Sequence, residues 1–95
     1  EFLREIAGIL LEDTPQRIAE LDQSLVAGDS SKFTRAAHSI KGSSANLGAA
    51  ALRAAAEKLE HHSRTQGMGD VGALVAAVKA EFARAQTELG KLLGR

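Results

Sequence analysis

The segment FTRAAHSIKGSSANL, residues 33–47, sets apolar and small side chains at the spacing of one helix face. An α-helix turns by roughly 100° per residue. By that rule, five residues fall within about 40° of one line along the helix: Phe33, Ala37, Ile40, Ser44 and Leu47. His38 lies about 140° from Phe33 on the same wheel. The segment therefore predicts an amphipathic helix that buries one face and turns His38 toward solvent.

The predicted face around His38 is lined mostly by small residues, with a lysine at its rim: Thr34, Gly42, Ala45 and Lys41. A glycine inside a helix costs roughly 1 kcal/mol relative to alanine, but its missing side chain lets another macromolecule approach the imidazole. A neutral imidazole, with an ordinary pKa of about 6.5, is a nucleophile at physiological pH. Lys41, one turn later, is placed to neutralise a phosphoryl group on Nε2. The spacing alone favours a phosphoryl-carrying histidine and an ordinary surface histidine about equally.

The first part of the chain also repeats at helical spacing, through Leu3, Ile6, Leu10, Ile18, Leu21 and Leu25. Within it, Thr14 followed by Pro15 has the pattern of an N-cap with proline at the first helical position. Two helices, or one helix kinked there, fit this pattern equally well. Gly28 predicts the end of this segment, and Asp29 or Ser30 predicts the start of the next helix.

Two further amphipathic segments follow the helix that ends at Gly48. The first has its apolar face at Leu52, Ala55, Ala56 and Leu59, and it ends before a loop at 67–69. Asp70 is positioned to cap the second, whose apolar face is Val71, Leu74, Val75, Val78, Phe82, Leu89 and Leu92. Four amphipathic segments with short connections and no strand pattern predict an all-α fold, an antiparallel four-helix bundle with a short or kinked N-terminal helix.

The composition limits the functions that this chain can have. Its 95 residues form a single domain, and 12 basic residues balance 12 acidic ones, which argues against a nucleic-acid partner. No cysteine is present to form a disulfide or a cysteine zinc site. No apolar run reaches the roughly 18 residues needed to span a bilayer, so we expect no membrane contact. The chain also lacks a glycine-rich phosphate loop of the GxxxxGK type, so the phosphoryl group must arrive from another protein.

The stretch HSIKGSSANLGAAAL, residues 38–52, strongly resembles the histidine-containing phosphotransfer (HPt) domain. That family has a lysine three residues after its histidine, a glycine four after it and a second glycine ten after it. His38, Lys41, Gly42 and Gly48 fill these positions. The resemblance implies a bundle that relays phosphoryl groups between histidine and aspartate in two-component signalling. By that likeness, His38 accepts the group from a receiver-domain phosphoaspartate and gives it to another receiver. The Mg²⁺ belongs to the receiver, so the chain needs no cofactor of its own.

The resemblance also suggests further site residues. Glu60 matches a glutamate that holds the imidazole Nδ1 in chemotaxis-type relatives, and Arg64 matches a basic position that helps dock receivers. Helix geometry and the family likeness together predict a receiver-docking surface around His38 and Lys41. It comprises Thr34, Arg35, Gly42 and Ala45, and Phe2 and Ile6 of the first helix extend it.

Several alternatives remain open on the sequence. We expect residues 1–95 to be one HPt domain cut from a longer, cytoplasmic sensor kinase chain. The domain would be a phosphocarrier without its own kinase or ATP site. It could instead be the phosphoacceptor domain of a chemotaxis-type kinase, served by a histidine kinase catalytic domain with ATP, or a helical adaptor that is never phosphorylated. His61 and His62, with Glu57 nearby, supply too few ligands for a metal, so no metal site is predicted.

Overall fold

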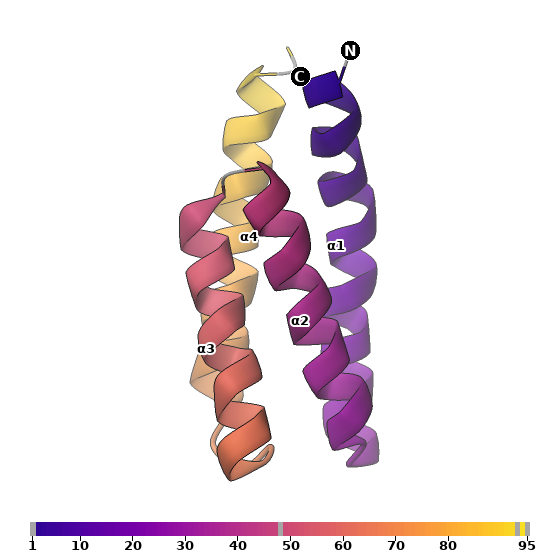
Figure 1. The fold of residues 1–95 in the computed structure, drawn as a ribbon, viewed down its shortest axis with the longest axis vertical. Helices are drawn as coiled ribbons and strands as arrows, with labels where there is room; N and C mark the ends of the chain where they lie inside the picture. Colours follow the sequence, from indigo (N-terminus) through magenta and orange to yellow (C-terminus); the bar gives the residue numbers. More distant parts are fainter. Residues whose placement is uncertain (1, 48, 93, 95) are drawn as a thin grey trace.

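The computed structural model describes residues 2–47, 49–92 and 94, with the side chains of residues 3, 47 and 92 left aside. Its four helices are α1 (Phe2–Ala27), α2 (Ser30–Leu47), α3 (Ala50–Gln66) and α4 (Gly72–Leu92). Successive helices run in opposite directions (Figure 1), and the described residues contain no strand. The all-α antiparallel four-helix bundle is therefore confirmed. The predicted helix end at Gly48 and the burial of Leu3, Leu47 and Leu92 lie outside what the structure describes.

Helix α1 is one continuous helix of 26 residues that contains Pro15. At about 1.5 Å per residue it is about 39 Å long, which matches the 39 Å long axis of the molecule. The alternatives of two helices and of a short N-terminal helix are both wrong, and Thr14 is not an N-cap. Leu10 and Leu21 are fully buried on either side of Pro15, so tertiary packing holds the helix together despite the proline. Thr14 is also buried, and its hydroxyl has no hydrogen-bond partner.

The turn between α1 and α2 matches the predicted stop and start signals. Gly28 has a φ of 75°, a left-handed conformation that suits glycine. The Asp29 N–H donates to the Ser24 carbonyl at 2.9 Å and the Gly28 N–H to the Leu25 carbonyl at 3.4 Å, which is the Schellman pattern. The Asp29 carboxylate then accepts the Lys32 N–H at 3.1 Å as an N-cap. These bonds close α1 and open α2 within two residues.

Two details of the predicted helix faces are corrected. Leu25, expected on the buried face of α1, is 36% exposed, because Ser24 takes the inward position one turn after Leu21. Asp70 does not cap α4, which begins at Gly72. The Val71 carbonyl accepts the first helical N–H, from Val75, whereas Asp70 lies in the preceding turn with a φ of 61°.

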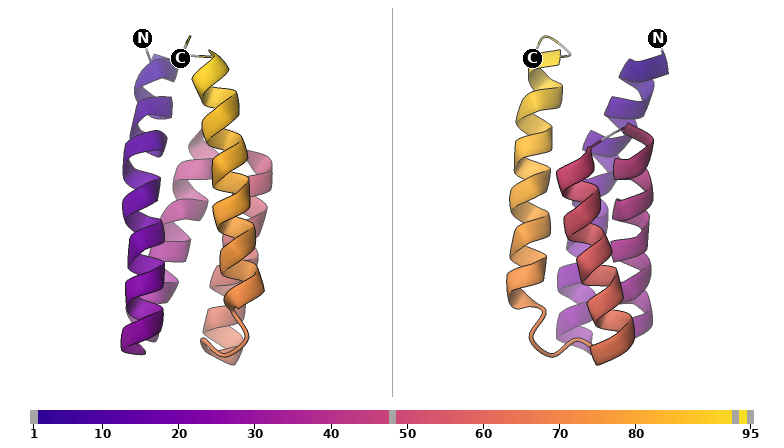
Figure 2. Two further views of the ribbon diagram at one scale, coloured as in Figure 1. Left: turned by 180° about the vertical axis from the view of Figure 1, so that it is seen from behind. Right: turned by 60° about the vertical axis from the view of Figure 1, so that its left-hand side comes forward.

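Helix α2 packs most extensively against α3 and α1 (Figure 2). The core residues that it supplies are Phe33, Ala36, Ala37 and Ile40, and Ser44 is buried on the same face. Leu52, Ala56 and Leu59 of α3 meet them, and Val75, Val78 and Phe82 of α4 complete the core. Because one face of α2 is fixed by this packing, the opposite face must be turned to solvent.

Candidate functional site

His38 lies halfway along α2, and its side chain is 60% exposed, as the helical spacing predicts. Its Nδ1 is 2.8 Å from Oε2 of Glu60, which comes from α3. An ionised carboxylate can only accept a hydrogen bond, so Nδ1 carries the proton and the neutral ring keeps a lone pair on Nε2. The contact expected between Glu60 and His38 is therefore present, and in the neutral ring it leaves the lone pair on Nε2.

Glu60 is a buried carboxylate that three side chains contact. Besides His38, Lys41 Nζ lies 2.8 Å from Oε1 and Arg64 Nη2 lies 2.9 Å from Oε2. Burial raises the pKa of Glu60, but the hydrogen bonds and positive charges of Lys41 and His38 outweigh it and leave the pKa below its ordinary value of 4.5. Glu60 is thus ionised at neutral pH, although only 3% of the residue is exposed.

The charges at this site sum to an excess positive charge when the imidazole is neutral. Lys41 and Arg64 contribute two positive charges against the single negative charge of Glu60. Arg64 is 61% exposed and Lys41 is 27% exposed, so both side chains reach from solvent to the buried carboxylate. The arrangement suits an anionic group near the ring.

A second polar link joins α2 and α3 one turn below His38, and sequence reasoning missed half of it. Ser63 Oγ donates to the Glu60 carbonyl at 2.9 Å and lies 2.8 Å from Thr34 Oγ1. Because Ser63 has one hydroxyl hydrogen, Thr34 is the donor between the two. Thr34, predicted to face a docking partner, is half-buried and bonded across the helix pair. The signal for Ser63 was its spacing of three from Glu60, which places both on one helix face.

The other residues predicted to dock a partner lie on the open side of α2. Gly42 and Ala45 are exposed, and a Cβ at Gly42 would meet nothing within 4 Å. No contact within the described part of the chain therefore requires a glycine at that position. Arg35 is exposed and lines, with Arg64, a cleft of about 520 Å³ between the start of α2 and the end of α3.

The predicted extension of this surface onto α1 finds little support in the geometry. Phe2 is 76% exposed and Ile6 is half-buried. Both belong to the first turns of α1, which project beyond α2 in Figure 1. His38, by contrast, lies near the middle of α2.

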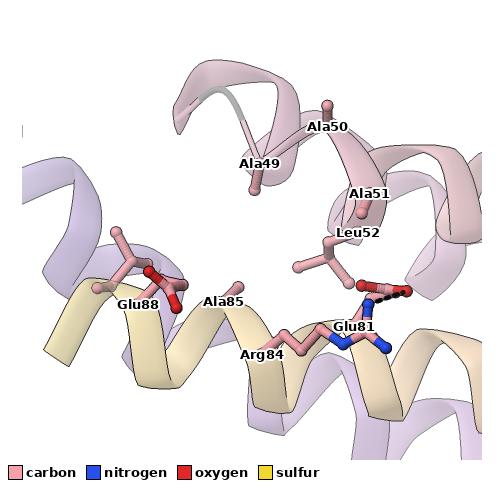
Figure 3. Close-up of a pocket in the computed structure, with 9 residues that line it drawn as sticks. Ala49, Ala50, Ala51, Leu52, Glu81, Arg84, Ala85 and Glu88 are labelled. Atoms are coloured by element: carbon pink, nitrogen blue, oxygen red, sulfur yellow. Dashed lines mark ion pairs between the residues drawn. The ribbon is translucent and has the colours of Figure 1, made fainter. Parts of the chain in front are cut away.

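A separate apolar cleft of about 350 Å³ lies between the start of α3 and α4 (Figure 3). Its lining is mainly alanine and leucine, together with the Arg84–Glu81 ion pair, and it contains no histidine. His62 is engaged elsewhere, with Nε2 3.2 Å from the Gly69 carbonyl. Within the described part of the chain, no group of three or more His, Cys, Asp or Glu side chains could hold a metal ion.

These observations define a class of protein: a small helical bundle with an exposed imidazole on its surface, held by a buried carboxylate. The family model for the Hpt domain matches residues 5–88, and the chain belongs to this family. Its function is accordingly histidine phosphotransfer in a phosphorelay, with receiver domains of response regulators as partners. The comparisons with curated proteins and with solved structures returned no match. No helix among the described residues is long and apolar enough to cross a membrane.

The low pKa of Glu60 makes a testable contribution to stability. Its folded pKa lies below the ordinary 4.5, so the unfolded chain binds this proton more readily and folding gains stability above about pH 4.5. That gain is lost as the pH falls through the folded pKa. Urea unfolding of wild type between about pH 7 and pH 3 should therefore show a steeper loss of unfolding free energy than Glu60→Gln.

The matched control for this experiment is Glu88→Gln, which removes an exposed carboxylate paired with Lys91 at 3.7 Å on α4. Its pH profile should follow that of wild type. Equal slopes for wild type and Glu60→Gln would contradict the assigned role of the buried carboxylate.

Proposed function

We propose that His38 accepts a phosphoryl group on Nε2 from the phosphoaspartate of one receiver domain and passes it to the aspartate of another. The observation that carries this proposal is the exposed imidazole whose Nδ1 is held at 2.8 Å by the buried Glu60 carboxylate. A nucleophilic nitrogen facing solvent, with its other nitrogen fixed, needs no cavity of its own. It needs a partner that brings the phosphoryl group.

The transfer step balances without any further reactant. The Nε2 lone pair of His38 attacks phosphorus, the N–P bond forms, and the P–O bond to the donor aspartate breaks to release its carboxylate. The proton stays on Nδ1, where Glu60 accepts it in a hydrogen bond, so the ring becomes a phosphorylated cation in the transition state and Glu60 stabilises it. Transfer onward is the reverse reaction with a second aspartate, and the neutral imidazole is the leaving group.

This chain contributes positioning and charge, which is most of what phosphoryl transfer needs. Lys41 and Arg64, already held beside the ring by Glu60, are the cations nearest to the incoming group. Gly42, Ala45 and Arg35 form the surface on which we expect the receiver to dock. The Mg²⁺ that assists the reaction would be held by the receiver, and this domain would bring no cofactor.

For the setting, we propose a cytoplasmic module of a hybrid sensor histidine kinase. A second setting, the phosphoacceptor domain of a chemotaxis-type kinase, is favoured by one specific observation. The Glu60–His38 contact is the arrangement by which the sequence resembles that subgroup. In that setting, the donor is ATP in a separate kinase catalytic domain, and receivers are the acceptors.

Two donors distinguish these settings. Wild type is incubated with a phosphorylated receiver domain in one arm, and with a histidine kinase catalytic domain and ATP in the other, and label on the chain is followed with time. Faster labelling from the receiver supports the relay, and faster labelling from the kinase domain supports the chemotaxis-type setting. No label from either donor would mean that this bundle is an adaptor without phosphotransfer chemistry.

A further inference from the structure

Arg64 and His38 contact the same oxygen atom of Glu60. Arg64 Nη2 lies 2.9 Å from Glu60 Oε2, and His38 Nδ1 lies 2.8 Å from the same oxygen. The separation between Arg64 Nη2 and His38 Nδ1 is therefore at most the combined length of these two contacts. Arg64 is four residues after Glu60 on α3, so it reaches the carboxylate from one turn beyond, whereas the ring arrives from α2.

A carboxylate beside Nδ1 has two opposite effects on a phosphoryl acceptor. It orients the ring, but its negative charge also stabilises the imidazolium, which has no lone pair on Nε2 and cannot attack. An adjacent positive charge cancels the second effect without disturbing the first. Arg64 is suited to this, because its guanidinium is ion-paired with the oxygen that holds the ring and remains 61% exposed.

The other charged groups around the ring do not replace Arg64. Lys41 occupies the opposite oxygen, Oε1. On α2, the Arg35 guanidinium bonds the Ser31 carbonyl. On α1, Arg17 and Glu20 are paired at 2.9 Å and line a cleft that does not include His38. On α4, Lys79 is paired with Asp22 of α1.

We propose that Arg64 is a positioning residue that acts through Glu60: it shares Oε2 with His38, limits the stabilisation of the imidazolium, and so keeps Nε2 nucleophilic to lower pH. This inference rests on the proposed function of His38. It assigns Arg64 a role before any receiver docks. That role is separate from a contact made by Arg64 with the partner.

The test measures the reactivity of His38 without a partner. Diethyl pyrocarbonate transfers an ethoxycarbonyl group to neutral imidazole, and mass spectrometry of the digested protein reports the rate for each histidine. Across a pH series, the modification rate of His38 rises from low to high, and the pH of half-maximal rate is its midpoint. In Arg64→Gln this midpoint should shift upward by roughly half a pH unit, which is the effect of one charge about 6 Å away in an aqueous dielectric. Arg64→Lys keeps the charge and should restore the midpoint.

Three controls isolate the effect. Arg84→Gln removes an exposed arginine from an ion pair on α4 (Figure 3), and it should leave the His38 midpoint unchanged. His62, whose ring contacts the Gly69 carbonyl rather than Glu60, serves as the reference within each digest. Glu60→Gln removes the negative charge and should shift the His38 midpoint downward, opposite to Arg64→Gln.

An unchanged His38 midpoint in Arg64→Gln, or an equal shift in Arg84→Gln, would overturn the inference. The same preparations are labelled from a phosphorylated receiver. If wild type is labelled but the His38 midpoint does not shift in Arg64→Gln, the proposed function stands and only the role of Arg64 is wrong. If the His38 midpoint shifts in Arg64→Gln but wild type takes up no label, the coupling through Glu60 is supported and the proposed phosphotransfer is contradicted.

Discussion

Gly42→Leu is expected to slow phosphoryl transfer from a receiver by roughly tenfold to a hundredfold while the bundle stays folded. The reason lies in the surroundings of Gly42, where a Cβ atom would meet nothing within 4 Å among the described residues. A leucine there projects from the exposed face of α2 into the space that the partner must occupy beside His38. Overpacking of a close contact typically costs about 1–3 kcal/mol, which corresponds to that range of rates.

The same substitution should raise the stability of the isolated domain. Leucine is a much better helix former than glycine, by roughly 0.5–1 kcal/mol. Urea unfolding measures this gain, and transfer at subsaturating receiver measures the loss. Gly8→Leu is the matched control, because Gly8 is also inside a helix with nothing within 4 Å. Unaltered transfer in Gly42→Leu, or equal losses in both variants, would contradict the docking surface.

Phe33→Ala should cost about 3–5 kcal/mol of unfolding free energy, the usual range for removing a buried aromatic side chain. Phe33 has no exposed surface and anchors the inner face of α2. A domain of this size is typically stable by only about 5–15 kcal/mol, so this loss removes a large fraction of its stability. It should also loosen the rotation of α2 that turns His38 outward.

The control for this prediction is Val26→Ala near the end of α1, where the valine is 90% exposed. A change there should stay within about 0.5 kcal/mol. A loss of less than about 1 kcal/mol for Phe33→Ala would show that the core is not centred on α2 as described. Thermal unfolding followed by circular dichroism measures both variants.

The orientation of α2 follows from its sequence because helical periodicity is set by the backbone. Phe33, Ala37 and Ile40 fall on one line, all three are fully buried, and His38 faces the other way. The turn at Gly28 and Asp29 was equally readable, because a left-handed glycine and an N-cap are local requirements of the chain.

Other features depend on contacts that no local pattern encodes. Pro15 reads locally as a helix start, yet burial of Leu10 and Leu21 carries α1 through it. The choice of Ser24 over Leu25 as the inward residue depends on how α1 lies against its neighbours.

At the site, the resemblance to relatives suggested Glu60, and helix spacing alone left its role open. The three side chains that contact its carboxylate come from two helices. That convergence required the structure, because the spacing within one helix does not report which side chain the next helix brings opposite.

The central claim is that His38 carries the phosphoryl group, and locating that group tests it most directly. Wild type and His38→Gln are incubated with a phosphorylated receiver domain, and the modified residue is identified by tandem mass spectrometry together with the acid and base stability of the label. The account predicts a single acid-labile, base-stable phosphoryl group on His38 of wild type and none on His38→Gln. Label at another residue, or equal labelling of the two proteins, would contradict it.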